Sequence, residues 1–180
     1  MFHKSFYVPG EEIPIIVLTP EQLNFLIYDN QFQGTLSPRL ERTKDIFIFG
    51  CTVALRVSDL LNLNGSNLEI SNDSYYLKVT SKKTQTFTRI KLPDYAIEIL
   101  KKYHCKRHRK LLPVITNYNL NKNIKLLAQT AGWTDRFAKM RSRRGISESP
   151  GKQLKNQTTH RFCDLLTSHT MRRTAITTML

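Results

Sequence analysis

The sequence is poor in the features that mark secreted, membrane and nucleotide-binding proteins. Its three cysteines, Cys51, Cys105 and Cys163, are too few for a disulfide framework, so we expect free, buried thiols. The apolar runs are too short to cross a bilayer, and the N-terminus lacks a secretion signal. Glycine-rich phosphate loops and paired carboxylates are also missing. The sequence therefore predicts a cytoplasmic protein and implies no ATP, metal or other cofactor.

Acidic residues are scarce in one part of the chain. Residues 1–100 hold ten Lys and Arg against eleven Asp and Glu, whereas residues 101–180 hold eighteen against three. The excess behind the net charge of +14 thus lies entirely in the second region. Such a basic region attracts polyanions, because binding releases the counterions that surround phosphate groups. Charge alone leaves DNA binding, RNA binding and a solvated surface open.

The length of 180 residues suits one domain, and a hydrophobic content of 40% is enough for a core. We expect residues 1–18 to form an extended leader or the remnant of an interdomain linker, and residues 19–180 to form the domain. A capping box of Thr19 and Gln22 predicts a helix over 20–30, followed by a loop over 34–38. Apolar periodicity and a capping Ser168 predict further helices over 39–55, from 57, over 94–104, over 121–131 and from 169 to the end.

Strand signals gather in the middle of the sequence. Residues 75–80 and 86–92 are β-branched and aromatic with near alternation, so they predict a β-hairpin around the polar turn 81–85, with 68–71 as a third short strand. Residues 133–167 are polar and basic with weak periodicity, and we expect a long loop with some helical pieces there. The order of elements predicts a mainly α domain with a small antiparallel β-sheet, an α+β fold. The tyrosines expected to pack in the core or on the hairpin are Tyr75, Tyr76, Tyr95, Tyr103 and Tyr118.

Three separated segments carry cationic side chains in positions suited to holding a phosphate. Arg56 lies at a predicted bend between two helices, where Asp59 could support it or pair with it. Lys83 lies in the predicted hairpin turn. His169 and Arg172 lie three residues apart on the opening turn of the last helix, so we expect them on one side of it, near the positive helix end. A guanidinium group can form two parallel hydrogen bonds to phosphate oxygens.

These segments resemble the boxes of the catalytic domain of tyrosine recombinases, the phage and transposon integrases. Residues 51–60 (Cys-Thr-Val-Ala-Leu-Arg-Val-Ser-Asp-Leu) resemble a Thr-Gly-Leu-Arg-x-Ser-Glu-Leu box, with Val53 and Ala54 in place of Thr-Gly. The loss of that glycine predicts a bend without a positive φ. Residues 169–174 (His-Thr-Met-Arg-Arg-Thr) resemble a His-x-Leu-Arg-Arg-Thr box, and the family's hairpin lysine matches Lys83. Residues 111–128 resemble the linker and helix of integrases from Bacteroidetes mobile elements.

The resemblance implies metal-free transesterification of double-stranded DNA, used for site-specific integration or recombination by a bacterial mobile element. In this family a tyrosine hydroxyl attacks the phosphate and forms a 3′-phosphotyrosyl link. Arg56 and Arg172 would clamp the phosphate. Lys83 would protonate the leaving 5′ oxygen, and His169 would assist proton transfer or bind the phosphate.

The resemblance also predicts residues that this sequence does not contain. No tyrosine follows Tyr118, and the second His/Trp position after the His-x-x-Arg box is missing as well. We therefore expect an inactive piece of a longer, nucleoid-associated recombinase that forms a tetramer only on DNA. Two other hypotheses compete with this one: a non-catalytic DNA-binding module or accessory factor that keeps the fold, and an RNA-binding protein.

Further basic residues are candidates for contacts with the DNA backbone, which position a protein without reading the base sequence. They are Lys82, Lys106, Arg107, Arg109, Lys110, Arg141, Arg143, Arg144 and Arg173. Two Cys/His pairs offer a zinc site as a weaker alternative, because closed zinc sites usually show tighter paired motifs. The residues of this alternative are Cys105, His108, His160 and Cys163.

Overall fold

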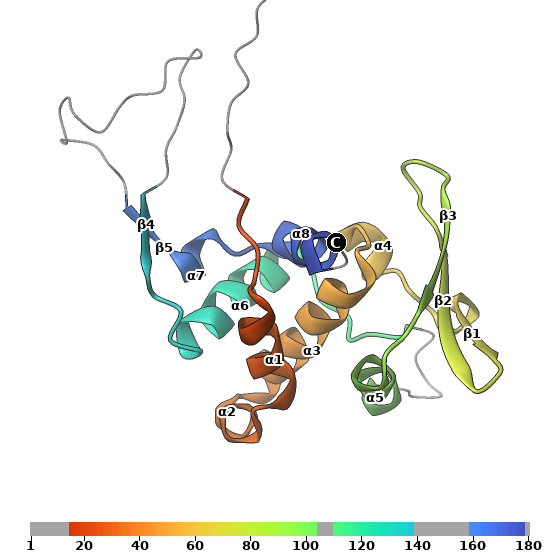
Figure 1. Ribbon diagram of the computed structural model, residues 1–180, viewed down its shortest axis with the longest axis horizontal. Coiled ribbons are helices and arrows are strands. Elements are labelled where there is room, and N and C mark those ends of the chain that lie inside the picture. The colour runs from red at the N-terminus through yellow and green to blue at the C-terminus, as the bar shows by residue number, and fades with distance from the viewer. Residues whose placement is uncertain (1–14, 104–109, 139–158, 179–180) are drawn as a thin grey trace, which may run out of the picture.

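The computed structural model describes residues 15–103, 110–138 and 159–178. This part of the chain is mostly helical with a small three-stranded antiparallel sheet (Figure 1), which confirms the predicted fold class. The helices are α1 (Pro20–Tyr28), α2 (Asn30–Thr35), α3 (Pro38–Val53), α4 (Val57–Leu60), α5 (Asp94–Tyr103), α6 (Asn117–Thr130), α7 (Phe162–Leu165) and α8 (Ser168–Thr178), with the 3-10 turn η2 (Gly65–Asn67). The strands are β1 (Leu68–Ser71), β2 (Ser74–Thr80), β3 (Phe87–Lys91), β4 (Arg136–Ala138) and β5 (Thr159–Arg161).

The capping box that the sequence predicts is present at the start of α1. Thr19 Oγ1 accepts a hydrogen bond from the N–H of Gln22 at 3.2 Å, and Gln22 Oε1 accepts one from the N–H of Thr19 at 3.0 Å. α1 ends earlier than predicted, because Asp29 closes it and caps α2 by accepting from the N–H of Phe32 at 2.7 Å. The loop predicted over 34–38 is therefore wrong for its first two residues, which belong to α2, and for Pro38, which begins α3.

α3 lies at the centre of the helical body. Eleven of its sixteen residues are buried, and it packs against α1, α5, α6 and α8. Residues 46–51 are buried without interruption, so this stretch has no polar face to turn toward solvent. A helix that is apolar on all sides belongs in a core, which explains why the other helices surround this one. The predicted helix over 39–55 is confirmed within two residues at each end.

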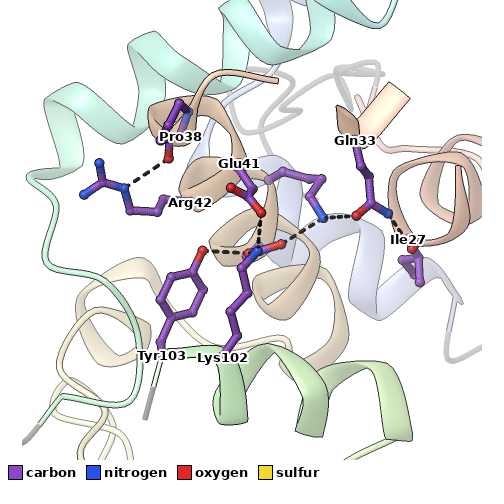
Figure 2. A network of polar contacts seen from close by, with 9 residues as sticks. Ile27, Gln33, Pro38, Glu41, Arg42, Lys102 and Tyr103 are labelled. Carbon is purple, nitrogen blue, oxygen red and sulfur yellow. Dashed lines mark hydrogen bonds and ion pairs between the residues drawn. The ribbon is translucent and has the colours of Figure 1, made fainter. Parts of the chain in front are cut away.

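A charged network lies inside this core and joins α3 to α5. Lys44 Nζ and Asp45 Oδ1 are 2.9 Å apart, and both side chains are almost fully buried. Figure 2 shows Lys102 and Tyr103 turned toward α3, where they donate to Asp45 Oδ2 at 2.6 and 2.7 Å. Burial alone would raise the pKa of Asp45, but hydrogen bonds from Lys102, Lys44 and Tyr103 bring it below its ordinary value. The network thereby fixes the end of α5 on the central helix.

The three-stranded sheet has the order β1–β2–β3, and its strands confirm the predicted hairpin and third strand. A two-residue turn joins β1 to β2, with Asn72 and Asp73 at φ values of 48° and 55°. Asn and Asp tolerate this left-handed conformation, and such turns match the twist of the strands that they join. Leu77 and Val79 are buried, whereas Lys78 between them is partly exposed, as expected for alternating sides of a strand.

The long loop predicted over 133–167 is wrong at residues 136–138 and 159–161, which form strands, whereas the helix over 162–165 fits the expected helical pieces. β4 pairs with β5 in a two-stranded antiparallel sheet, and α7 follows directly. Trp133 lies beside this sheet, with its ring centroid 6.4 Å from that of Phe25 and 6.3 Å from that of Phe162. Three-residue strands are too short to show a period in the sequence. Residues 139–158 lie outside the described residues.

The chain before α1 contacts the last helix. Leu18 is buried, and its N–H donates to Thr174 Oγ1 at 3.0 Å, so the described end of the predicted leader packs against α8. Residues 1–14 of that leader lie outside the described residues. α8 begins at Ser168 itself, whose N–H donates to Asn121 Oδ1 at 2.7 Å. Within 15–103, 110–138 and 159–178, no helix combines the length and the apolar character that crossing a membrane requires.

Candidate functional site

Arg56 lies at the bend between α3 and α4, as the sequence predicts. α3 ends at Val53 with Ala54 as its C-cap, and Arg56 is the residue before the first turn of α4. Ala54 has φ 54° and ψ 18°, so the prediction of a bend without a positive φ is wrong. The left-handed conformation closes many helices and suits glycine best, because a Cβ atom crowds the backbone there. The chain makes the bend that the family's glycine would favour, but it does so with alanine.

A serine of the hairpin connects Arg56 to Asp59. Arg56 Nη1 donates to Ser81 Oγ at 2.9 Å, and the same hydroxyl donates to Asp59 Oδ2 at 3.2 Å. Asp59 is buried, while Arg56 and Ser81 are half-buried. Asp59 is thus linked to Arg56 through the hydroxyl of Ser81, and its supporting role stays a prediction.

The turn that contains Lys83 begins at this serine. The N–H of Ser81 donates to the carbonyl of Thr86 at 3.0 Å, and the N–H of Gln85 donates to the carbonyl of Ser81 at 2.9 Å. Residues 82–86 are all exposed, so Lys83 projects from a solvent-facing turn. The hydrogen bond from Arg56 to Ser81 holds the base of this turn close to the start of α4.

The first turn of α8 carries the other two candidates. His169 is exposed and Arg172 is half-buried, whereas Thr170 and Met171 are buried. Gly50 of α3 allows this approach: a Cβ atom at Gly50 would lie 2.5 Å from Met171 Sδ. The same Cβ atom would lie 3.1 Å from a methyl carbon of Leu60 in α4, so α3, α4 and α8 meet at this glycine.

The three elements that carry the candidate cations, α4 with its preceding bend, α8 and the β2–β3 hairpin, are neighbours in space. Figure 1 shows α4 between α8 and the β2–β3 hairpin, and the packing at Gly50 and the bond from Arg56 to Ser81 join α4 to both. Among the residues that the structure describes, no hydrogen bond or ion pair links His169 or Arg172 to Arg56 or Lys83. The meeting of all four side chains at one phosphate stays a prediction.

Three of the candidate cations have no carboxylate partner in the part of the chain that the structure describes, a property they share with other basic side chains such as Lys82 and Arg173. The ion pairs of the described ranges use Lys44, Lys78, Arg89, Lys102 and Arg161. Arg56, Lys83 and Arg172 take part in none of them. Cations without a partner are free to neutralise an external anion, whereas paired ones would first have to give up their carboxylate.

The predicted DNA-backbone contacts fall into three groups. Lys82 and Arg173 are exposed. Lys110 donates to the carbonyl of Leu61 at 3.3 Å and to Asn62 Oδ1 at 2.8 Å, so its ammonium group already has partners within the protein. The remaining candidates lie outside the described residues: Lys106, Arg107, Arg109, Arg141, Arg143 and Arg144.

The tyrosines and cysteines bear on two further expectations. Tyr118 is 77% exposed, so its predicted packing role is wrong, because it lies on the outer side of α6 rather than against α3.

Cys51 and Cys163 are free and buried, as expected. Burial raises the pKa of the Cys51 thiol, which keeps it protonated. Cys105 and His108 of the zinc alternative lie outside the described residues.

Comparisons with known proteins agree with the fold. No family model and no curated protein matches the sequence. The structure is similar to the XerH site-specific recombinase in a pre-cleavage complex with its difH substrate, at 14% identity and a TM-score of 0.57 over 94% of this chain and 44% of that one. It is also similar to XerH in a post-cleavage complex with a palindromic difH substrate, at 15% identity and a TM-score of 0.59 over 94% of this chain and 43% of that one.

These likenesses define the fold. The chain has the fold found in these recombinases, which confirms the fold class that the sequence boxes predicted. It spans less than half the length of the recombinase chains that it matches.

Two residues that shape this region, Ser81 and Gly50, were not among the site residues predicted from the sequence. Ser81 was part of a predicted turn, and Gly50 was part of a predicted helix. Neither position carries a local signal, because Ser81 matters through a bond to a residue 25 positions away and Gly50 through contact with another helix.

Proposed function

We propose that this chain forms the phosphate-binding part of a site-specific tyrosine recombinase acting on double-stranded DNA. Arg56 and Arg172 bind the non-bridging oxygens of the scissile phosphodiester and stabilise the charge that develops in the transition state. His169 takes part in proton transfer to or from the attacking hydroxyl, or binds the phosphate. Lys83 donates its proton to the 5′ oxygen as the bond from phosphorus to that oxygen breaks.

The observation that carries this proposal is the junction of α3, α4 and α8 at Gly50. It packs the helix of the His-x-x-Arg box against the helix that follows Arg56, while Ser81 joins Arg56 to the lysine turn. In this proposal, three segments that are far apart in the sequence bring their cations to one phosphate. The likeness of the fold to recombinases in complexes with their DNA substrates supports the proposal.

Strand cleavage needs a tyrosine hydroxyl that this sequence does not supply after Arg172. In the proposed reaction that hydroxyl loses its proton and attacks phosphorus, and the bond to the 5′ oxygen breaks. A 3′-phosphotyrosyl link forms, so no ATP is needed for religation. A second candidate function, a DNA-binding module or accessory factor, would use the same phosphate site without cutting.

A double-mutant cycle tests whether the two arginines share a phosphate. The affinity of the 180-residue chain for a random-sequence duplex is measured at several salt concentrations for Arg56→Ala, Arg172→Ala and the double variant. Two groups that bind one phosphate act together, so the losses of binding free energy should be non-additive by about 0.5–3 kcal/mol. The slope of log affinity against log salt should become shallower by about 0.9 for one lost phosphate contact.

Arg173 provides the matched control. It is exposed and adjacent to Arg172, and as an independent contact with the DNA backbone it should give additive losses when combined with Arg56→Ala. Additive losses for Arg56 and Arg172 as well would show that they bind separate phosphates. That result would contradict the proposed site for both functions.

A further inference from the structure

Ser81 occupies a position that the proposed chemistry does not yet explain. It is the half-buried member of an otherwise exposed turn, and its hydroxyl lies between a guanidinium and a buried carboxylate. A serine hydroxyl can donate one hydrogen bond and accept others. Here the proton points to Asp59, which leaves the oxygen lone pairs to Arg56 Nη1.

We propose that Ser81 is a positioning residue that sets Arg56 and the lysine turn relative to each other before DNA binds. This inference rests on the proposed phosphate site. The ionised groups at both ends polarise the hydroxyl, so each of the two hydrogen bonds strengthens the other. Ser81 also closes the turn through its own N–H and carbonyl. A shift of this residue would therefore move both Lys83 and the hydroxyl that accepts the hydrogen bond from Arg56.

The hydroxyl also separates two groups that would otherwise attract each other. Without it, the guanidinium of Arg56 is free to approach the carboxylate of Asp59 and pair with it directly. A bidentate pair of this kind would use the same N–H groups that the phosphate needs. Ser81 therefore keeps Arg56 oriented while leaving its remaining donors available.

The test compares Ser81→Ala with Ser81→Thr, which keeps the hydroxyl. We expect Ser81→Ala to weaken binding to duplex DNA by roughly five- to tenfold and to reduce the non-additivity between Arg56→Ala and Arg172→Ala. Ser81→Thr should restore both quantities. Thr80→Ala is the matched control, because Thr80 is the adjacent, exposed residue and its side chain lies on the other side of the strand.

A measurement without DNA separates positioning from a direct contact of Ser81 with the ligand. The Nη–H signals of Arg56 in NMR spectra of the free protein, whose Nη1 donates to Ser81, should broaden or exchange faster in Ser81→Ala and recover in Ser81→Thr. Unchanged Arg56 signals, or undiminished non-additivity in Ser81→Ala, would overturn the inference while leaving the phosphate site standing. A lack of coupling between Arg56 and Arg172 in the parent protein would instead refute the proposed function and this inference with it.

Discussion

Replacing Ala54 with glycine tests whether the bend before Arg56 stores backbone strain. Ala54 has φ 54° and ψ 18°, a region in which a residue with a Cβ atom pays about 1–2 kcal/mol. Glycine avoids this cost, but it loses about 0.5–1 kcal/mol more conformational entropy on folding. It also gives up the contacts of a half-buried methyl group. We expect Ala54→Gly to raise the free energy of unfolding by about 0.5 kcal/mol.

Ala131 offers a matched control for this substitution. It ends α6 as Ala54 ends α3 and is also half-buried, but its φ is −73° and its ψ is 0°. Glycine relieves no strain there, so Ala131→Gly should lower the free energy of unfolding by about 1 kcal/mol. The entropy and methyl contributions are similar at both positions. The difference between the two variants therefore isolates the cost of the left-handed conformation, about 1–2 kcal/mol.

Urea denaturation measures this difference directly. Both variants should keep the m-value of the parent protein, since neither changes the surface that unfolding exposes. In thermal unfolding, each kcal/mol should move the midpoint by about 2–4 °C for a protein of this size. Equal losses of stability in the two variants would refute the assignment of strain to the bend at Ala54.

Other substitutions test the packing and the polar network. Gly50→Ala should lower the free energy of unfolding in urea by about 1 kcal/mol, because a Cβ atom 2.5 Å from Met171 Sδ outweighs the better helix propensity of alanine; an unchanged stability would contradict the close packing. Tyr103→Phe removes a hydrogen bond to ionised Asp45 and should cost about 1.5 kcal/mol, roughly twice the cost of Tyr95→Phe, whose partner is neutral. The pKa of Asp45 is lowered by folding, so its contribution to stability is present above the ordinary value of 3.8 and is lost as the pH falls through the folded value. Tyr103→Phe should therefore flatten the acid loss seen in unfolding experiments at low pH, and an unaltered acid profile would contradict this account.

Local signals explain which parts of the fold the sequence could predict. The capping box of Thr19 and Gln22 acts within one turn, and the hairpin strands alternate over five or more residues. α3 could be recognised because Ile46, Phe49 and Val53 recur at helical spacing in its second half. In each case the stabilising contacts are near in sequence or repeat often enough to show a period. The candidate cations were found by their place in such segments.

The parts that the sequence could not predict depend on distant contacts. The left-handed conformation of Ala54 follows from the packing of α3 and α4, since alanine itself disfavours it. β4 and β5 are short strands separated by 20 residues, so their pairing leaves no trace in either segment. Ser81 and Gly50 resemble ordinary turn and helix residues until the other elements are in place.

The three segments that carry the candidate cations are held in place with unequal rigidity. α4 and α8 meet at Gly50 inside the core, where close packing resists displacement. Residues 82–86 are exposed, and the turn that they form is held at Ser81 by hydrogen bonds worth about 1 kcal/mol each. Phosphate binding requires arginines that are oriented in advance, whereas a proton donor must reach the leaving oxygen only as the bond breaks. A change at Gly50 should therefore act on Arg56 and Arg172 together, while a change within 82–85 should leave their coupling intact.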